Sequence, residues 1–392
     1  MALLPEIVRR AVRSRLGKGL ARRPRAHKPL PSMSLYFSDP LYDLIGMGFE
    51  SDYPIQRLSR TVFACGNKAV VVRYAQKQDL QILRNSNFER IYLLIDDDLE
   101  ALSDDDGLPE DYRRKLVDYR DGPFRRLMEM VTDVVAPSEN ILRAYTSRRA
   151  ALLDPAQCHA AGHLKHHEAP HQFDIVFAAT RSHLQDLRHI APAIAQVLRQ
   201  RPEAHLTTFL NGHAPNCLKL PNAHHLPMME WPRYRSFVAE NRFHVAIAPA
   251  LDTAFNRARS ISKLHDHAAF GAAGLYSRQQ PFDRIVTHNT SGLLLDNDPG
   301  KWRDTLIDLA DRRDHSLKLA TGGQVLSETL GDMRRVRRFW IEELGLERCS
   351  PLTSSQPFCT RQGPELEVLR ESADWPFSVA VRFLPMSVVM VY

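Results

Sequence analysis

Residues 243–277 read FHVAIAPALDTAFNRARSISKLHDHAAFGAAGLYS, and two short apolar runs, FHVAIAPAL and AGLYS, enclose a segment with helical spacing. Such runs, bounded by turn residues and separated by a helix, are typical of strand–helix–strand units in a parallel sheet covered on both faces. The alternation continues on both sides of this stretch. It predicts strands at 173–180, 204–212 and 291–297, and helices at 183–202, 230–242 and 299–313. Residues 173–330 are therefore expected to form an α/β domain.

The preceding part of the chain shows the same alternation less regularly. Strands are expected within 60–76 and 88–98, and helices within 77–85 and 110–131. The run TDVVAPSENILRAY, at 132–145, predicts a strand followed by a helix that Ser138 caps. A second, reduced α/β domain is thus expected at 31–155, so that two Rossmann-like domains face a cleft. Ligands of open parallel sheets bind at the carboxyl ends of the strands.

Composition limits the class of protein. The 392 residues exceed what one hydrophobic core usually organises, and no apolar run approaches the roughly eighteen residues of a membrane-spanning helix. Residues 1–30 carry nine Lys or Arg and one Glu, and subtracting this +8 from the total of +6 leaves −2 for the rest. A body of that charge does not favour nucleic acid as a partner. Five scattered cysteines without a C-x-x-C pair predict reduced thiols in a cytoplasmic protein.

The two ends of the chain are treated separately. In the basic leader, 1–30, apolar residues recur at four-residue spacing and arginines flank them. Residues 1–28 are expected either to lie as a helix on an anionic membrane surface or to remain a solvated extension. Residues 331–392 are expected to form a helix that crosses back to the first domain, followed by a tail to which we assign no function.

A histidine-rich stretch separates the two domains. Residues 154–172, DPAQCHAAGHLKHHEAPHQ, lose the apolar periodicity and contain five histidines and two prolines. We place the linker at 156–172 and interpret it as hydrophilic. The alternative is a zinc site formed by Cys158, His163, His166 and His167, but the stretch has neither the strand nor the turn pattern that would support one.

Basic residues follow the strand FHVAIAPAL directly. Arg257, Arg259 and Lys263 lie where a strand ends and a helix begins, which is where free backbone N–H groups and the helix dipole attract anions. Asn256 could cap this helix or bind a ligand hydroxyl. Because cations at a helix N-terminus oppose the dipole, an anion-binding role is favoured over a solvated basic helix.

Other candidates follow neighbouring strands. Arg181, Ser182, His183 and Asp186 come after the strand at 173–180, and Ser182 could cap the next helix while His183 faces the cleft. A single histidine at such a position is more often a capping or core residue. Gly292, Leu293 and Leu294 follow a polar turn and could offer backbone amides at the same edge of the sheet.

Taken together, several motifs carry a resemblance to a known family. The runs P-x-x-D-T-x-F-N-R-x-x-S, K-L-x-[acid]-x-A-A-x-G and G-L-L-x-x-N-D-P-x-x-W resemble the donor half of GT-B glycosyltransferases related to glycosyltransferase family 4, of the bacterial surface polysaccharide type. The run YLLIDDDLEAL resembles a segment of their amino-terminal halves. The match covers about 173–310, and 85–145 loosely. The chain is divergent, because Asp266 stands for the second Glu of an E-x7-E pattern and Ala258 for the first.

The resemblance implies retaining transfer of a sugar from a nucleotide-sugar donor, without a metal or other cofactor, to a cell-surface glycan or lipid-linked acceptor. It implies that Arg257 and Lys263 meet the donor diphosphate and that Asp266 binds hydroxyls of the ribose or sugar. The amides of Gly292, Leu293 and Leu294 would line the nucleotide site. We count His183 with Arg257 and Lys263 as catalytic candidates. Arg181, Ser182 and Asn256 join Asp266 among the donor-binding candidates.

Asp96, Asp97 and Asp98 allow three interpretations. They could cap a helix, contact an acceptor, or hold a divalent cation as in a GT-A glycosyltransferase. A GT-A domain would need more strands before the motif than residues 31–95 comfortably supply, and we assign these residues to the acceptor side. The favoured function is a cytoplasmic glycosyltransferase that rests peripherally on the inner membrane. The alternative is a non-catalytic nucleotide- or glycan-binding protein of the same fold.

Overall fold

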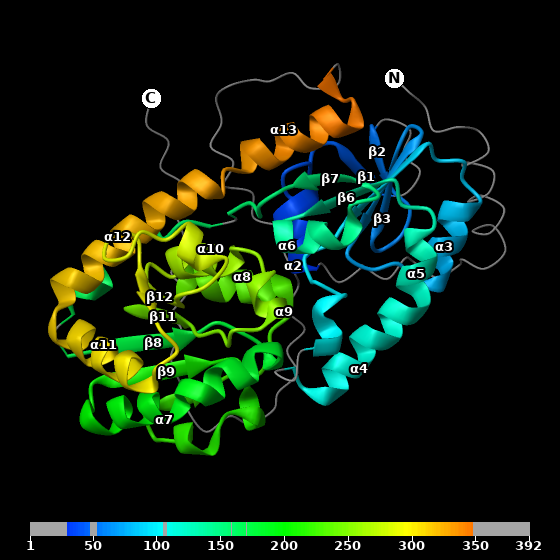
Figure 1. Cartoon of the computed structure of the whole chain (residues 1–392). Coiled ribbons are helices and arrows are strands. Elements are labelled where there is room, and N and C mark those ends of the chain that lie inside the picture. Colours follow the sequence, from blue (N-terminus) through cyan, green and yellow to red (C-terminus); the bar gives the residue numbers. More distant parts are fainter. Residues whose placement is uncertain (1–29, 48–52, 105–107, 158, 170, 348–392) are drawn as a thin grey trace, which may run out of the picture. The chain divides into compact units, whose positions relative to one another are not determined.

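The computed structural model of the chain describes residues 30–47, 53–104, 108–157, 159–169 and 171–347, which contain two separate β-sheets (Figure 1). The described residues belong to a single compact unit. The predictions for the basic leader, for Cys158 and for the C-terminal tail fall outside the described residues.

The first sheet lies in the amino-terminal half and has seven strands in sequential order. They are β1 (Ile45–Met47), β2 (Ile55–Arg57), β3 (Val62–Cys65), β4 (Lys68–Val72), β5 (Arg90–Leu94), β6 (Asp133–Ala136) and β7 (Arg149–Leu152). Neighbours pair in parallel except for β2–β3 and β3–β4. Only Gly66 and Asn67 join β3 to β4, and a two-residue turn forces antiparallel pairing. Gly66 supplies the positive φ, 58°, that this turn needs.

Helices cover both faces of this sheet. They are α2 (Pro31–Met33), η1 (Ser34–Ser38), α3 (Lys77–Arg84), η2 (Ala101–Asp104), α4 (Glu110–Tyr119), η3 (Arg120–Phe124), α5 (Arg125–Met128), α6 (Glu139–Leu142) and η4 (Arg143–Tyr145). On one face, side chains of α3, α4 and α5 pack against β4, β5 and β6; on the other, η1 does so. The predicted cap of α6 is confirmed, because Ser138 Oγ accepts a hydrogen bond from the Asn140 N–H at 3.1 Å.

The second sheet is entirely parallel within the described residues. Its strands are β8 (Phe173–Phe177), β9 (Ala204–Thr208), β10 (Ala223–His225), β11 (Val245–Ala248), β12 (Ala273–Ser277) and β13 (Leu293–Leu295), in the order β10-β9-β8-β11-β12-β13. This is the Rossmann order. From β8 the following strands are added on one side and from β11 on the other, so the order in which strands are added reverses between these two neighbours. The parallel sheet predicted from the apolar runs is confirmed. The edge strand β10 was not predicted, because its residues AHH form no apolar run.

The helices around this sheet pack on its two faces. They are η5 (Lys165–Glu168), η6 (Arg181–His183), α7 (Leu184–Gln200), η7 (Asn211–His213), η8 (Asn216–Leu218), α8 (Trp231–Glu240), α9 (Ala254–Arg257), α10 (Ser262–Ala269), η9 (Phe282–Arg284), α11 (Pro299–Asp311) and α12 (Arg313–Leu330). Side chains of α7 and α11 form one core with β8, β9 and β11, whereas Val238 of α8 and Phe270 lie in the core of the opposite face.

The segment after β11 differs from its prediction. Instead of one helix, α9 ends after a single turn, and four residues separate it from α10. Thr253 rather than Asn256 caps α9, since its hydroxyl accepts a hydrogen bond from the Asn256 N–H at 3.1 Å. Phe255 and Ala258 are buried in the core of the first sheet. The short helix is therefore anchored by its apolar side chains in the amino-terminal half.

The histidine-rich stretch lies between β7 and β8, and its described residues are not all at the surface. His167 is only 1% exposed, and its Nε2 is 2.9 Å from the Gly271 carbonyl oxygen. His166 and His244 pack beside it, with ring centroids 4.3 and 5.4 Å from that of His167. The polar composition of the stretch concealed this burial, because both ring nitrogens of His167 have hydrogen-bond partners inside the second half.

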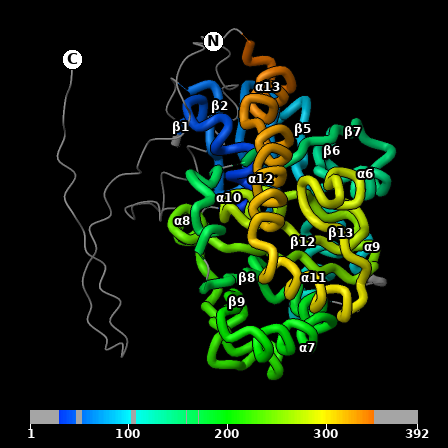
Figure 2. The backbone as a smooth tube through the Cα atoms, turned by 90° about the vertical axis from the view of Figure 1, so that its left-hand side faces the viewer, coloured from blue at the N-terminus to red at the C-terminus, as the bar shows by residue number. Residues whose placement is uncertain are grey.

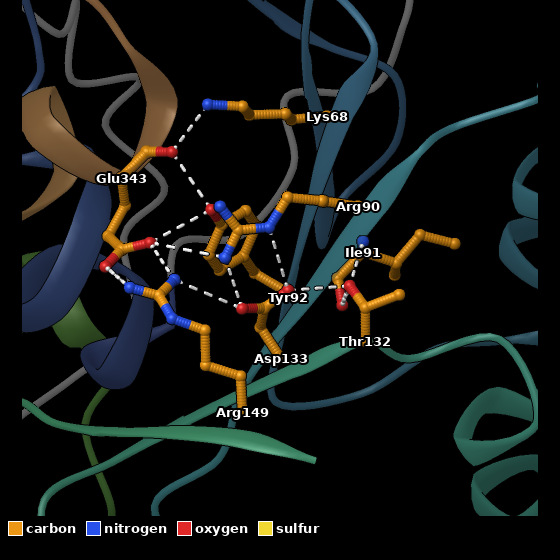
Figure 3. A network of polar contacts seen from close by, with 8 residues as sticks. All are labelled: Lys68, Arg90, Ile91, Tyr92, Thr132, Asp133, Arg149 and Glu343. Carbon is orange, nitrogen blue, oxygen red and sulfur yellow. Dashed lines mark hydrogen bonds and ion pairs between the residues drawn. The ribbon is translucent and has the colours of Figure 1, made fainter.

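The last described helix, α13 (Met333–Leu344), packs on the first sheet, where Trp340 Nε1 donates a hydrogen bond to the Tyr36 carbonyl oxygen at 2.6 Å. It follows α12 along the molecule in Figure 2. Figure 3 shows the polar network at its end, in which Arg149 binds both carboxylate oxygens of Glu343, at 2.6 and 2.8 Å. Tyr92 and Lys68 donate to the Glu343 carbonyl oxygen at 2.9 and 2.8 Å. These contacts tie the end of the chain's last described helix to β4, β5 and β7.

Candidate functional site

The candidate site lies at the carboxyl ends of β8 and β11, where the strand order of the second sheet reverses. In open parallel sheets the loops after two such strands leave in opposite directions and form a ligand crevice. Here the loop after β8 leads through η6 into α7, and the loop after β11 leads through α9 into α10. All of the predicted cationic residues of the second half lie on these two segments.

A chain of hydrogen bonds joins the two loops. Asp186, at the start of α7, is 5% exposed; its Oδ1 accepts hydrogen bonds from the Leu251 N–H at 2.8 Å and from Asn256 Nδ2 at 2.9 Å. Its Oδ2 lies 3.1 Å from His183 Nδ1. Asn256 Oδ1 in turn accepts from Arg259 Nε at 3.1 Å. We call His183, Asp186, Asn256 and Arg259 the relay. Its hydrogen bonds hold the side chains of His183 and Arg259 in place.

Asn256 therefore has a role that the sequence did not indicate. It is 7% exposed, and its Nδ2 also donates to the Leu251 carbonyl oxygen at 3.0 Å. Its amide is occupied on both sides by groups of this chain. The prediction that Asn256 caps the helix is wrong, and its side chain acts instead as the link between Asp186 and Arg259.

Two cations of the site differ in their partners. The Arg259 guanidinium lies over the Phe255 ring, 4.7 Å from its centroid, and no carboxylate among the described residues forms an ion pair with it. Lys263, in the first turn of α10, donates to the Ala178 carbonyl oxygen and lies 3.1 Å from Asp266 Oδ2. Lys263 thus reaches the end of β8 from the segment after β11. Arg259 keeps N–H groups available for an anion.

His183 is neutral at physiological pH. Burial lowers its pKa to about 4, and the positive charges of Arg259 and Lys263 add to this effect while Asp186 opposes it. Because Nδ1 faces the Asp186 carboxylate, we assign the proton of the neutral ring to Nδ1. Nε2 is then a hydrogen-bond acceptor, which suits a hydroxyl group and not a phosphate oxygen.

The structure separates the remaining predicted cations from this cluster. Arg257 is exposed and pairs with Asp252. Arg181 is exposed as well, and its Nη2 lies 3.2 Å from Asp111 Oδ1 of α4. Ser182 does not cap α7; its hydroxyl is 3.1 Å from that of Thr180. None of the contacts in the described chain brings Arg257 together with Lys263 and His183.

The structure shows the Leu294 amide in use and Gly292 and Leu293 closely packed. Leu293 and Leu294 are strand residues of β13, 4% and 5% exposed, and the Leu294 N–H donates to His288 Nδ1 at 3.0 Å. Gly292 has φ 154°, and a Cβ there would come within 2.9 Å of the Gly274 carbonyl oxygen. The glycine is required by close packing against β12. The Leu294 N–H is therefore not free for a nucleotide in this structure, and the role of Gly292 and Leu293 stays a prediction.

The three aspartates after β5 have divided roles. Asp98 Oδ1 accepts hydrogen bonds from the N–H groups of Glu100 and Ala101, both at 3.1 Å, and thus caps η2. Asp97 forms an ion pair with Arg73. Asp96 lies 3.5 Å from Arg73 Nε and accepts a hydrogen bond from the Ser32 hydroxyl at 2.5 Å. Of the three interpretations, helix capping holds for Asp98, and Arg73 stands where a metal ion would have to be.

A small pocket adjoins the candidate site. Asp266 lines it together with Trp231 and Tyr234 of α8 and Ser262 and His265 of α10. Burial and the nearby Asp266 carboxylate raise the pKa of Tyr234. A carboxylate beside aromatic rings is suited to a ligand with hydroxyl groups. A ligand bound to Asp266 would lie close to Lys263, because these two side chains form an ion pair.

Two further features of the described chain bear on the predictions. No group of three or more His, Cys, Asp or Glu in it is arranged to hold a metal ion. None of its helices is long and apolar enough to cross a membrane. Arg259 was counted from the sequence among the cations of an anion site but not among the residues carried over from the family resemblance, and Asp186 was given no role. The i,i+3 spacing of His183 and Asp186 was the signal that could have identified the relay.

Two Rossmann-like sheets, followed by a helix that packs on the first, define a GT-B type of fold and confirm the predicted fold class. Among solved structures, the chain is similar to sucrose-phosphate synthase from Thermosynechococcus elongatus, with a TM-score of 0.50, 10% identity, and 77% of this chain and 75% of that chain covered. It also aligns with TarM (TM-score 0.49, 9% identity, 70% of this chain and 54% of that chain). HepE from Anabaena, solved with UDP-glucose, aligns with a TM-score of 0.48 and 11% identity over 70% of this chain and 78% of that chain.

At these identities the likeness concerns the fold alone. The chain spans about half the length of TarM, 54%. No family model matches the sequence, and no curated protein matches it either. The resemblance to glycosyltransferase family 4 therefore stays a prediction.

Proposed function

We propose that the protein is a glycosyltransferase that moves a sugar from a nucleotide-sugar donor to a glycan or lipid-linked acceptor. The observation that carries the proposal is that Arg259 and Lys263 both lie near enough to the neutral His183 to lower its pKa, at the switch point of a Rossmann sheet. The main demand of this reaction is to stabilise the diphosphate that leaves with the nucleotide. Two cations held by the surrounding fold meet that demand without a divalent cation.

In this proposal Arg259 and Lys263 bind the donor diphosphate. Arg259 is oriented by Asn256 and by the Phe255 ring, so little ordering is needed when an anion arrives. Lys263 would exchange its bond to Asp266 for a phosphate oxygen. Loss of the Lys263 charge should weaken donor binding by about 1.5 to 3 kcal/mol, the range for a hydrogen bond to a charged group.

Asp266 and the neutral His183 would bind hydroxyls of the donor. Asp266 would accept hydrogen bonds from the ribose or the transferred sugar, with the pocket beside Trp231 and Tyr234 receiving the attached ring. His183 Nε2 would accept a hydrogen bond from a hydroxyl of the transferred sugar, because the other ring nitrogen, Nδ1, is hydrogen-bonded to Asp186. Arg181 and Ser182, after β8, would lie at the rim, and Arg257 would contribute less than Arg259 because Asp252 already pairs with it.

The finer parts of the proposal follow from the family resemblance. Transfer with retention of configuration, independence of divalent cations, and a role in cell-surface polysaccharide synthesis are expected on that ground. Action in the cytoplasm is expected instead from the five scattered cysteines, and contact of residues 1–28 with an anionic membrane surface from the pattern of the basic leader. The charge of −2 outside the leader supports a sugar-nucleotide ligand over nucleic acid.

The proposal is tested by the thermal stability of the purified protein with a panel of nucleotide sugars and nucleoside diphosphates, with and without EDTA. Binding to the native state raises the melting temperature by mass action. We expect one nucleotide sugar to raise it, unchanged by EDTA. The shift should be lost in Lys263→Ala and retained in Arg257→Ala, the matched control on the same segment.

Two other outcomes would change the assignment. A shift that requires a divalent cation would contradict the metal-independent mechanism. Binding without transfer of the sugar to any acceptor would favour a non-catalytic nucleotide- or glycan-binding protein. That alternative is supported by the loss of the first acid of the E-x7-E pattern, at Ala258, and by the replacement of the second Glu with Asp266.

A further inference from the structure

The pocket beside the candidate site is lined by residues of both halves of the chain. Leu35 of η1 belongs to the first half, and the rest of the lining comes from His159, α8 and α10. The centre of a water molecule can move through about 30 Å³ inside this pocket, which is room for about two waters. A space of this size holds a small substituent of a larger ligand.

Much of the pocket lining is apolar. It includes Leu35, Val238 and Ala269, of which Val238 and Ala269 also belong to the buried core beside α8. Trp231 and Tyr234 line the pocket from α8, with ring centroids 5.9 Å apart and ring planes inclined at 25°. An apolar end of a ligand, such as a methyl group, would be shielded from water among these side chains.

Trp231 has an unused hydrogen-bond donor. Its Nε1 is buried and has no partner in the described part of the chain. By contrast, Trp302 Nε1 and Trp340 Nε1 donate to the carbonyl oxygens of Asp296 and Tyr36, at 3.1 and 2.6 Å. Native proteins pair nearly all buried polar atoms, and an indole N–H can only donate. Because Trp231 lines the pocket, a ligand bound there can supply the missing acceptor.

The charged groups of the pocket already have partners in the chain. Arg235 Nη1 lies 2.7 Å from Asp39 Oδ2, and Arg235 Nε donates to His159 Nε2 at 3.1 Å. Burial lowers the pKa of His159 to about 4, and the Arg235 charge adds to this effect, so the ring is neutral at pH 7. Asp266 Oδ2 lies 3.1 Å from Lys263 Nζ. A neutral substituent therefore suits the pocket better than a carboxylate or an ammonium group.

We propose that the pocket binds the acetamido group of an N-acetylated amino sugar in the donor and that Trp231 determines this specificity. The amide carbonyl oxygen accepts a hydrogen bond from Trp231 Nε1. The amide N–H donates to Asp266, whose carboxylate has lone pairs beyond the one that faces Lys263. The methyl group packs among the apolar residues of the lining.

A hydroxyl group in place of the acetamido group would leave that apolar lining unfilled. The inference rests on the proposed transferase function, and it adds to that function the class of sugar that the donor carries.

The test uses the full-length protein and pairs of sugar 1-phosphates, so that it does not depend on the nucleotide base. The pairs are N-acetylglucosamine 1-phosphate with glucose 1-phosphate, and N-acetylgalactosamine 1-phosphate with galactose 1-phosphate. Saturation-transfer NMR titrations give the affinity of each compound. In at least one pair we expect the N-acetylated member to bind the wild type about tenfold more tightly or better, because it adds hydrogen bonds and a buried methyl group.

Two variants assign this preference. Trp231→Phe keeps an aromatic ring beside Tyr234 and removes the N–H, so the preference for the N-acetylated member should fall to about threefold or less. Trp302→Phe is the matched control, because it also removes an indole N–H, one that donates to the Asp296 carbonyl oxygen away from the pocket. It should keep the wild-type preference.

The outcomes separate this inference from the proposed function. If neither member of a pair binds the wild type, if both bind equally, or if Trp231→Phe keeps the preference, the inference is refuted even where a nucleotide sugar stabilises the protein. If the preference is found and depends on Trp231, the inference stands even where no sugar is transferred to any acceptor. In that case the transferase proposal is the one that fails.

Discussion

The two sheets carry polar clusters at equivalent positions, the carboxyl ends of neighbouring parallel strands, but the charges are balanced in opposite ways. In the second half, Arg259 has only a neutral side chain, Asn256, as its hydrogen-bond partner, and Lys263 shares one carboxylate. In the first half, Arg73 alone faces both Asp96 and Asp97. The ends of parallel strands thus carry, in the second half, a cation without a carboxylate partner and, in the first half, a cation that faces two carboxylates. The first arrangement suits an anionic donor.

The largest expected difference between the clusters is in stability. Arg73→Met leaves two buried carboxylates without their cation, and breaking a buried ion pair in this way costs about 3 to 5 kcal/mol. Lys263→Met, in the second cluster, should cost no more than about 1 kcal/mol, as for a partly exposed pair. Urea denaturation of both variants measures the difference. Equal losses would show that the two clusters are not balanced differently.

A smaller effect is expected at Asp186, which connects the two loops of the second site. Asp186→Ala removes the acceptor for the Leu251 N–H and for Asn256 Nδ2. Unpaired buried donors cost about 1 to 3 kcal/mol, so the variant should lose roughly that amount of unfolding free energy. The affinity for the nucleotide sugar should fall as well, because Asn256 no longer holds the Arg259 side chain in position. Unchanged affinity in a folded Asp186→Ala protein would contradict the role of the relay.

Acid should weaken the second half more than the first. Residues 30–157 contain no histidine, whereas burial lowers the pKa of His167 to about 4 and of His244 to about 3. The unfolded chain, with histidine pKa values near 6.5, binds protons first as the pH falls. The stability that these neutral rings provide is complete above about pH 6.5 and is lost as the pH falls toward the folded values. We expect about 1 to 2 kcal/mol per ring between pH 7 and pH 5.

Hydrogen exchange at pH 7 and pH 5, corrected for intrinsic rates, measures this difference. Amides of β8 and β11 should lose protection at pH 5 while those of β4 and β5 keep it. His167→Asn should reduce the pH dependence of the second sheet. Equal loss in both sheets would assign the effect to carboxylates throughout the chain and not to the histidines.

The sequence predicted the second sheet well because its strands are buried on both faces. FDIVFAAT, FHVAIAPAL, AGLYS and SGLLLDN are apolar runs, and each coincides with a strand. The strands β1, β2 and β10 have three residues each and were not predicted. Such short strands depend on pairing with a neighbour, which local composition does not record.

The sequence predicted where the candidate site lies but not which residues form it. The segment after β11 was the right region, because basic residues at the end of a parallel strand are informative on their own. The break between α9 and α10 decides which arginine belongs to the same site as Lys263. No proline or glycine marks that break in the sequence. The break leaves Arg257 beside Asp252 and brings Arg259 to Asn256. Side-chain direction is set here by the packing of Phe255 and Ala258 in the other half.

The most direct measurement is isothermal titration calorimetry with the nucleoside diphosphate that stabilises the wild type most, using Arg259→Ala and Arg257→Ala. The account predicts that Arg259→Ala lowers the affinity by about 1.5 to 3 kcal/mol, which is roughly 10- to 150-fold, whereas Arg257→Ala stays within a factor of about three. Equal affinity of the two variants, or a larger loss in Arg257→Ala, would contradict the assignment of the diphosphate to the cluster at the switch point.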